Sequence, residues 1–231
     1  MRRGRLGQNR PGWNAALAGP GLPRLWLLSD TRRLPDPRPV AASLPPGSAV
    51  LARDLDPALL PSLAALARRR RLVLMVAGDG RAALAHGAGL HLPDRRPAKG
   101  LLPLLLARRS GRRVLLSVAA HGRAGLARAR RLGADLVLLS PVFPTASHPG
   151  APALGPLRWA ALARRAGRPV IALGGVTPKS SRRLPPVAWG WAAIGALMGG
   201  GGHPQELLPR GHSVSRMSRF APLRDGRPQS A

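Results

Sequence analysis

Short apolar segments recur along this chain, and stretches rich in Ala, Leu and Arg separate them. Eight such segments can be counted: Arg24–Ser29, Ala49–Ala52, Leu72–Ala77, Gly89–Leu92, Val114–Val118, Asp135–Leu139, Pro169–Leu173 and Gly190–Ile194. Each is apolar for most of its length rather than on alternate residues, which is typical of parallel strands buried on both faces. The chain is therefore predicted to fold around a parallel sheet.

The stretches between these segments have the periodicity of helices. Ala and Leu recur every three or four residues in Pro57–Arg70, Arg123–Leu132 and Leu157–Ala166, and Arg fills the remaining face. The first connection, Asp36–Leu44, holds two prolines, which predicts a short or distorted helix. A strand and helix repeated eight times predict an α/β fold, a small (β/α)8 TIM barrel, with a doubly wound open sheet as the alternative.

Residues 23–198 form the predicted folded domain. The chain has 231 residues and is 45% hydrophobic, which suits one sizeable core. Residues 1–22 and 199–231 are basic and rich in Gly and Pro, so we expect disordered extensions that are dispensable for folding. No apolar run is long enough for a membrane span or a secretory signal, which predicts a cytoplasmic protein without membrane contact. The absence of cysteine excludes disulfides and thiolate chemistry.

The chain is strongly basic, because 37 Lys and Arg residues against 9 Asp and Glu give a net charge of +28. Only Lys99 and Lys179 are lysines, and Ala, Leu, Gly and Pro are abundant, so the arginine excess fits a codon bias toward G and C. The arginines are spread along the sequence, which favours that interpretation over nucleic-acid binding. No nucleic-acid partner is therefore expected, and the oligomeric state is left open.

The candidate site residues follow the predicted strands, because barrel enzymes place their chemistry at the carboxyl ends of the strands. Gly174 and Gly175 follow the seventh strand and Gly195 follows the eighth, and exposed glycine N–H groups there predict a phosphate monoester site. Arg53 is expected to bind a second phosphate bidentately, and Asp79 to hold a bridging Mg²⁺. The expected partners are therefore small phosphorylated substrates.

Three segments carry a resemblance to a known family. Ser140-Pro-Val-Phe-Pro-Thr145 follows the sixth strand, Ala172-Leu-Gly-Gly-Val176 lies at the seventh, and Leu25-Trp-Leu-Leu-Ser-Asp30 is the first strand. Together they resemble the thiamine phosphate synthase family, which includes the thiazole tautomerases of the TenI type. The similarity covers most of residues 24–198.

The resemblance implies a (β/α)8 barrel that joins hydroxymethylpyrimidine pyrophosphate to a thiazole phosphate. Pyrophosphate leaves with the help of Mg²⁺, and the thiazole nitrogen captures a pyrimidine carbocation, so the chemistry demands charge stabilisation rather than a strong base. The positions that match the family's thiazole phosphate loops are Gly174, Gly175 and Gly195. The positions that match its pyrophosphate and metal site are Thr145, Ser147, Arg53 and Asp79.

The chain departs from the family's pattern around the pyrophosphate and the metal. Leu55 and His148 stand where the family has lysines, and Gly78 stands where it has an asparagine. The family's second metal carboxylate, expected five residues after the strand-four histidine, has no match. Asp94, three residues after His91, is the candidate substitute. A protonated His148 is the candidate replacement for the missing lysine.

These departures keep the tautomerase branch open. His121 stands twelve residues before Gly133, the interval at which the tautomerase has its proton-shuttling histidine. An imidazole that titrates near neutrality suits the movement of a ring proton. Three hypotheses remain: a thiamine phosphate synthase that uses Arg53, His148 and Mg²⁺, a thiazole tautomerase that uses His121 and no metal, and a non-catalytic barrel that binds phosphate or another polyanion.

Overall fold

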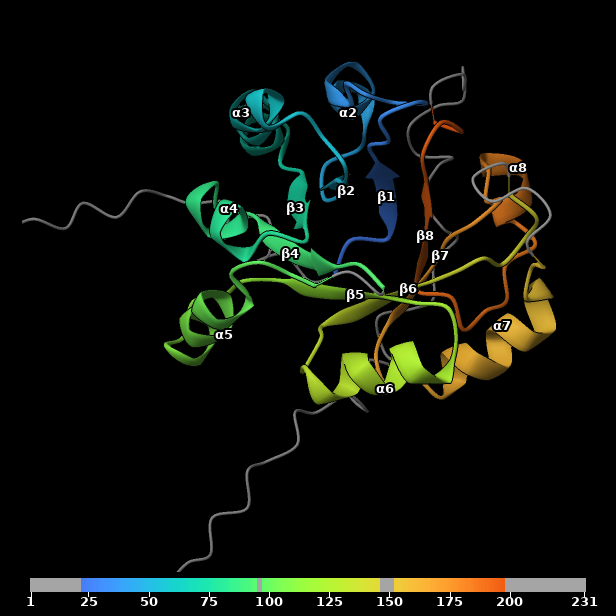
Figure 1. The fold of residues 1–231 in the computed structure, drawn as a ribbon. Helices are drawn as coiled ribbons and strands as arrows, with labels where there is room; N and C mark the ends of the chain where they lie inside the picture. The colour runs from blue at the N-terminus through green and yellow to red at the C-terminus, as the bar shows by residue number, and fades with distance from the viewer. Residues whose placement is uncertain (1–21, 95–96, 146–151, 198–231) are drawn as a thin grey trace, which may run out of the picture.

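The computed structural model describes residues 22–94, 97–145 and 152–197. In this part of the chain the parallel strands form a closed barrel, in which each strand pairs with the next and β1 pairs with β8 (Figure 1). The strands are β1 (Leu25–Leu28), β2 (Ala49–Ala52), β3 (Val73–Ala77), β4 (Gly89–Leu92), β5 (Leu116–Ala120), β6 (Leu136–Leu139), β7 (Val170–Ala172) and β8 (Gly190–Ala193). Closure confirms the TIM barrel and excludes the open sheet, whose first and last strands would have a free edge.

The fifth strand lies two residues further along the chain than the apolar pattern predicts. Val114 and Leu115 are buried, but the Val114 N–H bonds back to the carbonyl of Arg112 (3.0 Å) in the turn that precedes the strand. The ladder therefore starts at Leu116. As a consequence, His121 follows β5 directly.

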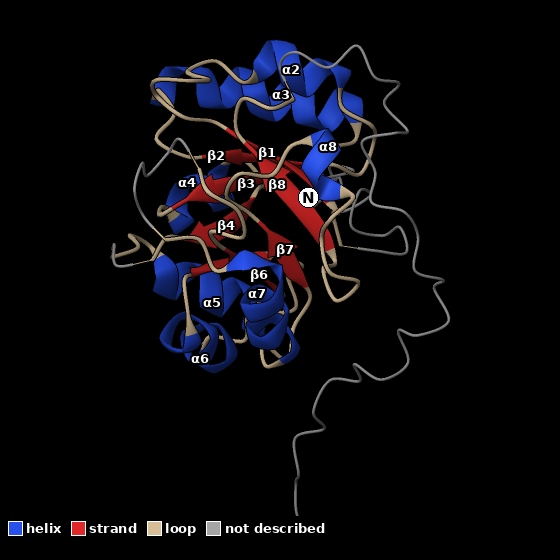
Figure 2. Cartoon of the chain, turned by 90° about the vertical axis from the view of Figure 1, so that its right-hand side faces the viewer, coloured by secondary structure: helices blue, strands red, loops and turns tan. Residues whose placement is uncertain are grey.

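The helices cover the outside of the barrel (Figure 2). They are α2 (Arg38–Ser43), α3 (Leu60–Arg70) with the 3-10 turn η1 (Pro57–Leu59) before it, α4 (Gly80–Ala85), α5 (Leu101–Arg109), α6 (Arg123–Arg131), α7 (Gly155–Arg164) and α8 (Pro178–Ser181). The predicted helices are confirmed, and α2 has only six residues, as its prolines predict. Among the described helices, none is long and apolar enough to cross a membrane. The predicted extensions lie outside the described residues, apart from Leu22.

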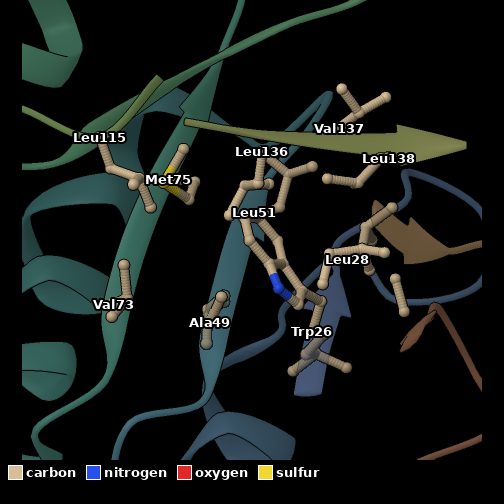
Figure 3. Close-up of a cluster of buried hydrophobic side chains, with 14 of the residues drawn as sticks. Trp26, Leu28, Ala49, Leu51, Val73, Met75, Leu115, Leu136, Val137 and Leu138 are labelled. Carbon is tan, nitrogen blue, oxygen red and sulfur yellow. The ribbon is translucent and has the colours of Figure 1, made fainter. Parts of the chain in front are cut away.

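Large apolar side chains fill the barrel beside the first three strands. Trp26 and Leu28 of β1 gather with Leu51 of β2 and Met75 of β3 (Figure 3), and each is at most 1% exposed. Full burial of a side chain of this size contributes about 1.5–3 kcal/mol. The indole N–H of Trp26 donates to the carbonyl of Pro23 (2.9 Å), so its burial leaves no polar group unpaired.

The barrel has two rims with different roles. Since all strands are parallel, the loops that follow them lie at one end, which we call the carboxyl-end rim. The helices run back in the opposite direction, so they end at the other side, which we call the amino-end rim. The candidate site residues follow the strands and therefore belong to the carboxyl-end rim.

Candidate functional site

Strand order divides the candidate residues between two sides of the carboxyl-end rim. Gly174 and Gly175 follow β7, Gly195 follows β8, and Arg53 follows β2. Because β7, β8, β1 and β2 are successive neighbours in the barrel, these residues share one side. The acidic and histidine candidates follow β3, β4 and β5 on the other side: Asp79, Asp94 and His121.

The two glycines after β7 allow their loop to pack against the loop after β6. Gly174 and Gly175 have positive φ angles, +93° and +64°. A Cβ atom on Gly174 would lie 2.6 Å from Cα of Pro141, and one on Gly175 would collide with the carbonyl oxygen of Pro144. The Phe143 N–H also donates to the Gly174 carbonyl (3.1 Å). Backbone geometry and close packing therefore both require glycine at these two positions.

The same region presents backbone donors. Within the described ranges, the N–H groups of Gly174, Gly175 and Gly195 have no hydrogen-bond acceptor. Thr177, further along the loop, is occupied as the N-cap of α8, since its hydroxyl accepts from the Ser180 N–H (3.1 Å). The glycine N–H groups thus remain available to an anion such as a phosphate.

Arg53 is held on the rim by the end of β1. Its N–H donates to the buried Ser29 hydroxyl (2.8 Å), and that hydroxyl donates back to the Arg53 carbonyl (2.8 Å). Its Nη2 donates to Oδ2 of Asp30 (2.6 Å). The buried Nε has no hydrogen-bond partner among the described residues, and Oδ2 of Asp54 lies 3.6 Å from it. The guanidinium is therefore fixed in place and retains donor capacity.

The Asp30 carboxylate accepts hydrogen bonds from two arginine side chains, those of Arg33 and Arg53. The hydrogen bond from the Arg33 side chain is the main cause that lowers the pKa of Asp30 to about 2. The backbone N–H groups of Arg32 and Arg33 also donate to Oδ1 (3.2 and 3.1 Å). Asp30 therefore stays ionised near neutral pH and keeps Arg53 oriented. The sequence marks Asp30 only as the end of the first strand, and no local pattern predicts its pairing with Arg53.

His91 is a buried, neutral imidazole close to Arg53. It lies on β4 and is 4% exposed, and its Nδ1 lies 2.8 Å from the hydroxyl of Ser117, its register partner on β5. Burial is the main cause that lowers the pKa of His91 to about 3, and the positive charges of Arg53 and Arg128 add to it. The interior beside Arg53 therefore carries no second positive charge from this ring.

Asp79 serves as the N-cap of α4. Its Oδ1 accepts hydrogen bonds from the N–H groups of Arg81 and Ala82, both at 2.9 Å. Gly78 before it has a φ of +73°, a conformation that suits both glycine and the asparagine of the family's motif. The backbone of Lys99 pairs with Asp79 in an isolated bridge. This brings one of the two lysines beside the site, although no sequence motif marks it.

Asp94 and His121 form a hydrogen-bonded pair across the ends of β4 and β5. His121 Nδ1 donates to Asp94 Oδ2 (2.7 Å). The His121 side chain is 52% exposed, so it faces the rim rather than the core. With the proton on Nδ1, Nε2 of the neutral ring is a proton acceptor. The sequence predicts a metal ligand for Asp94 and a proton shuttle for His121, and the fold brings the two residues together.

Asp79 and Asp94 are the candidate carboxylate ligands for Mg²⁺. No group of three or more His, Cys, Asp or Glu residues that could hold a metal occurs in the described part of the chain. Mg²⁺ is usually held by one or two carboxylates and completes its shell with water and substrate phosphates. Asp79 Oδ2 and Asp94 Oδ1 are not used by the contacts above. These two carboxylate oxygens fit a Mg²⁺ whose coordination shell is completed by water and a substrate phosphate.

Three predicted residues belong to the loop after β6. Thr145 is half-buried and is the last described residue before the gap. Ser147 and His148 lie outside the described residues, so their roles stay predictions. The loop begins with a cis peptide bond between Ser140 and Pro141.

The fold is shared with solved structures of other proteins. Thiamine phosphate pyrophosphorylase from Pyrococcus furiosus is 22% identical with a TM-score of 0.60, over 80% of this chain and 93% of that one. A 2-keto-3-deoxy-6-phosphogluconate aldolase from Zymomonas mobilis is 16% identical with a TM-score of 0.56, over 88% and 99%. A 3-hexulose-6-phosphate synthase is 15% identical with a TM-score of 0.55, over 80% and 97%. At these identities the likeness establishes the barrel fold.

Family membership comes from the sequence. No curated protein matches the chain. A family model described as thiamine monophosphate synthase matches residues 57–197, which is more than half of the chain. This range contains the described candidates after β3 to β8, whereas Arg53 precedes it. The family resemblance is therefore confirmed, and the chain belongs to the TMP-TENI family of thiamine monophosphate synthases.

Proposed function

We propose that this barrel is a thiamine phosphate synthase, a transferase that couples hydroxymethylpyrimidine pyrophosphate to thiazole phosphate and releases pyrophosphate. The observation that carries the proposal is the presence of two anion-binding features on one side of the rim. These are the glycine N–H groups after β7 and β8, which have no acceptor among the described residues, and the fixed guanidinium of Arg53 after β2. Coupling a phosphate ester to a pyrophosphate ester needs both, because each substrate must be oriented by its anionic group.

Each feature has a role in this reaction. The N–H groups of Gly174, Gly175 and Gly195 bind the thiazole phosphate and orient the thiazole nitrogen toward the pyrimidine. Arg53 binds the pyrophosphate, and its charge stabilises the negative charge that develops as pyrophosphate leaves. Thr145 belongs to the same pyrophosphate site, together with two residues outside the described ranges, Ser147 and a protonated His148.

Mg²⁺ is the cofactor proposed for this site. Asp79 and the remaining oxygen of Asp94 would hold it together with pyrophosphate oxygens, and when bound it supplies positive charge to the departing group. The residues of the chain do the rest: Asp30 keeps Arg53 in a fixed orientation, and His91, being neutral, adds no competing charge beside it.

The test is an assay of the full chain with both substrates and Mg²⁺, in which thiamine phosphate is detected by chromatography. Arg53→Ala should lower kcat/KM by on the order of 100-fold or more, the usual cost of a lost partner for transition-state charge. Arg38→Ala is the matched control, because it also removes an arginine paired to an aspartate, Asp36 (2.8 Å), but outside the site. No product from the wild type, or equal activity of the two variants, would contradict the proposal.

The Asp94–His121 hydrogen bond favours a thiazole tautomerase as the second candidate. In that function Asp94 orients His121 instead of holding a metal, and Nε2 moves the thiazole ring proton. The test follows exchange of that proton for deuterium by NMR without Mg²⁺. Exchange that His121→Gln abolishes and His86→Gln preserves, without formation of thiamine phosphate, would select the tautomerase. Binding of thiazole phosphate in calorimetry with neither activity would select the non-catalytic barrel.

A further inference from the structure

The fold gathers arginines that are far apart in the sequence. Helices α5, α6 and α7 end at the amino-end rim, where each connects to the start of the next strand. Eight exposed arginines in these three segments form what we call the arginine arc: Arg109, Arg112, Arg113, Arg130, Arg131, Arg164, Arg165 and Arg168. The spread of the arginines along the sequence predicts no binding surface, but in the barrel these three helix ends are neighbours.

Hydrogen bonds show that the three segments touch. Arg108 Nη2 donates to the Gly133 carbonyl (3.1 Å), which joins the end of α5 to the connection after α6. Arg130 Nη1 donates to the Arg165 carbonyl (2.8 Å), which joins the ends of α6 and α7. Figure 1 shows the three helices following one another along the lower part of the view. The arc is therefore one continuous surface.

Carboxylates are concentrated at the opposite rim. The described carboxylates that follow strands β1 to β4 are Asp30, Asp36, Asp54, Asp56, Asp79 and Asp94. Asp135, before β6, is the exception, and both of its oxygens accept from Arg108 (2.6 and 3.1 Å), which is not part of the arc. Among the described residues, no carboxylate forms an ion pair with an arginine of the arc. Within the described part of the chain, no carboxylate neutralises the positive charge of the arc, which can therefore bind an external anion.

We propose that the arginine arc binds the phosphate backbone of nucleic acid without reading its sequence. Packed helices lie about 8–10 Å apart, so three helix ends span about 20 Å. A strand of duplex advances about 3.4 Å per nucleotide, so this span faces about six phosphates of one strand. The guanidinium fork binds phosphate oxygens bidentately. The three segments contain no Asn or Gln, and their aromatic residue, Trp159, is buried, so they offer little for base recognition.

An anionic membrane is a less suitable partner for this surface. Basic elements that lie on membranes also insert large apolar side chains. The large apolar side chains exposed in the described residues are Leu102, Leu106 and Leu157. Leu102 and Leu157 lie in the first turns of α5 and α7, toward the carboxyl-end rim. Leu106, one turn after Leu102 on the same face of α5, is the single one of these leucines that approaches the arc. The arc therefore has no apolar cluster to insert, and nucleic acid is the partner that its chemistry fits.

Two triple variants of the full chain test the proposal. The arc variant carries Arg109→Gln, Arg131→Gln and Arg168→Gln, three exposed arginines. The matched control carries Arg81→Gln, Arg123→Gln and Arg158→Gln, three exposed arginines in the first turns of α4, α6 and α7. Both variants lower the net charge by the same amount and keep residues 1–21 and 198–231. Any difference between them therefore reports on the arc.

Binding of a fluorescein-labelled, mixed-sequence duplex DNA of 20 base pairs is followed by anisotropy over a range of KCl concentrations. At 0.1 M salt the arc variant should bind at least about tenfold more weakly than the wild type, and its slope of log K against log salt should be smaller by about 3, while the control stays like the wild type. Equal weakening of both variants, no binding by the wild type at 0.1 M salt, or binding to phosphatidylserine vesicles but not to the duplex would overturn the proposal. Thermal unfolding of each variant establishes that it is folded.

Discussion

At the scale of single residues, the shifted pKa values of Asp30 and His91 determine the charges of these two side chains near Arg53. Hydrogen bonds from Arg33 hold the pKa of Asp30 at about 2, so this carboxylate is ionised wherever the protein is folded near neutrality. Burial holds the pKa of His91 at about 3, so this ring is neutral over the same range. The charges of Asp30 and His91 beside Arg53 therefore do not change between pH 5 and pH 8.

His91 should make the folded state sensitive to acid. Its pKa is about 3 when folded and 6.5 when unfolded, so only the unfolded chain gains a proton as the pH falls below 6.5. The free energy of unfolding should therefore fall by about 2 kcal/mol from pH 7 to pH 5 through this residue alone. Urea unfolding of the wild type and of His91→Gln, which keeps a polar group near Ser117, measures the difference. His86→Gln is the control and should retain the wild-type dependence; an unchanged dependence in His91→Gln would contradict the assignment.

At the scale of elements, the loops after β6 and β7 should behave as one packed unit. Gly175 and Gly133 have nearly the same φ, +64° and +61°, but a Cβ on Gly175 would collide with Pro144 while one on Gly133 has nothing within 4 Å. Gly133→Ala should cost about 1–2 kcal/mol for the left-handed backbone alone. Gly175→Ala should cost about 1–3 kcal/mol more, because the β6 loop must move. Chemical denaturation of both variants measures the packing contribution, and equal costs would show that the loops are not packed together.

The elements themselves are predictable from the sequence because central parallel strands are buried on both faces and read as uniform apolar runs. The contacts between residues at the ends of different strands are not predictable from the sequence. Asp30 and Arg53 are 23 residues apart, and Asp94 and His121 are 27 apart. These pairs depend on which strands are neighbours and on their register. The packing role of Gly174 and Gly175 also depends on another loop, so local sequence indicates a turn and a phosphate site but not the contact.

At the scale of the whole molecule, the barrel separates most of the described carboxylates from the arginine arc. Apart from Asp135, the described carboxylates stand where strands lead into helices, and the arginines of the arc stand where α5, α6 and α7 lead into strands. Asp79 at the N-cap of α4 and the arginines in the last turns of α5, α6 and α7 complement the helix dipole. In a parallel barrel this local preference accumulates at two opposite rims. The positions of the arginines in the sequence do not predict the arc, because the strand order decides which helix ends are neighbours.

The clustered arginines of the arc should make the stability of the whole molecule depend on salt. Charges about 8–10 Å apart on adjacent helix ends repel one another at 0.01 M salt, where the screening length is about 30 Å, and much less at 0.3 M. The Tm should therefore rise with NaF concentration, by about 2–4 °C for each 1 kcal/mol of repulsion removed. The arc variant should have a higher Tm than the wild type at 0.01 M, and the gap should close at 0.3 M. The control variant removes the same charge at the rim that holds carboxylates, so its gain should be smaller. Thermal scans by circular dichroism measure all three proteins, and equal gains in both variants would show that the repulsion comes from net charge and not from the arc.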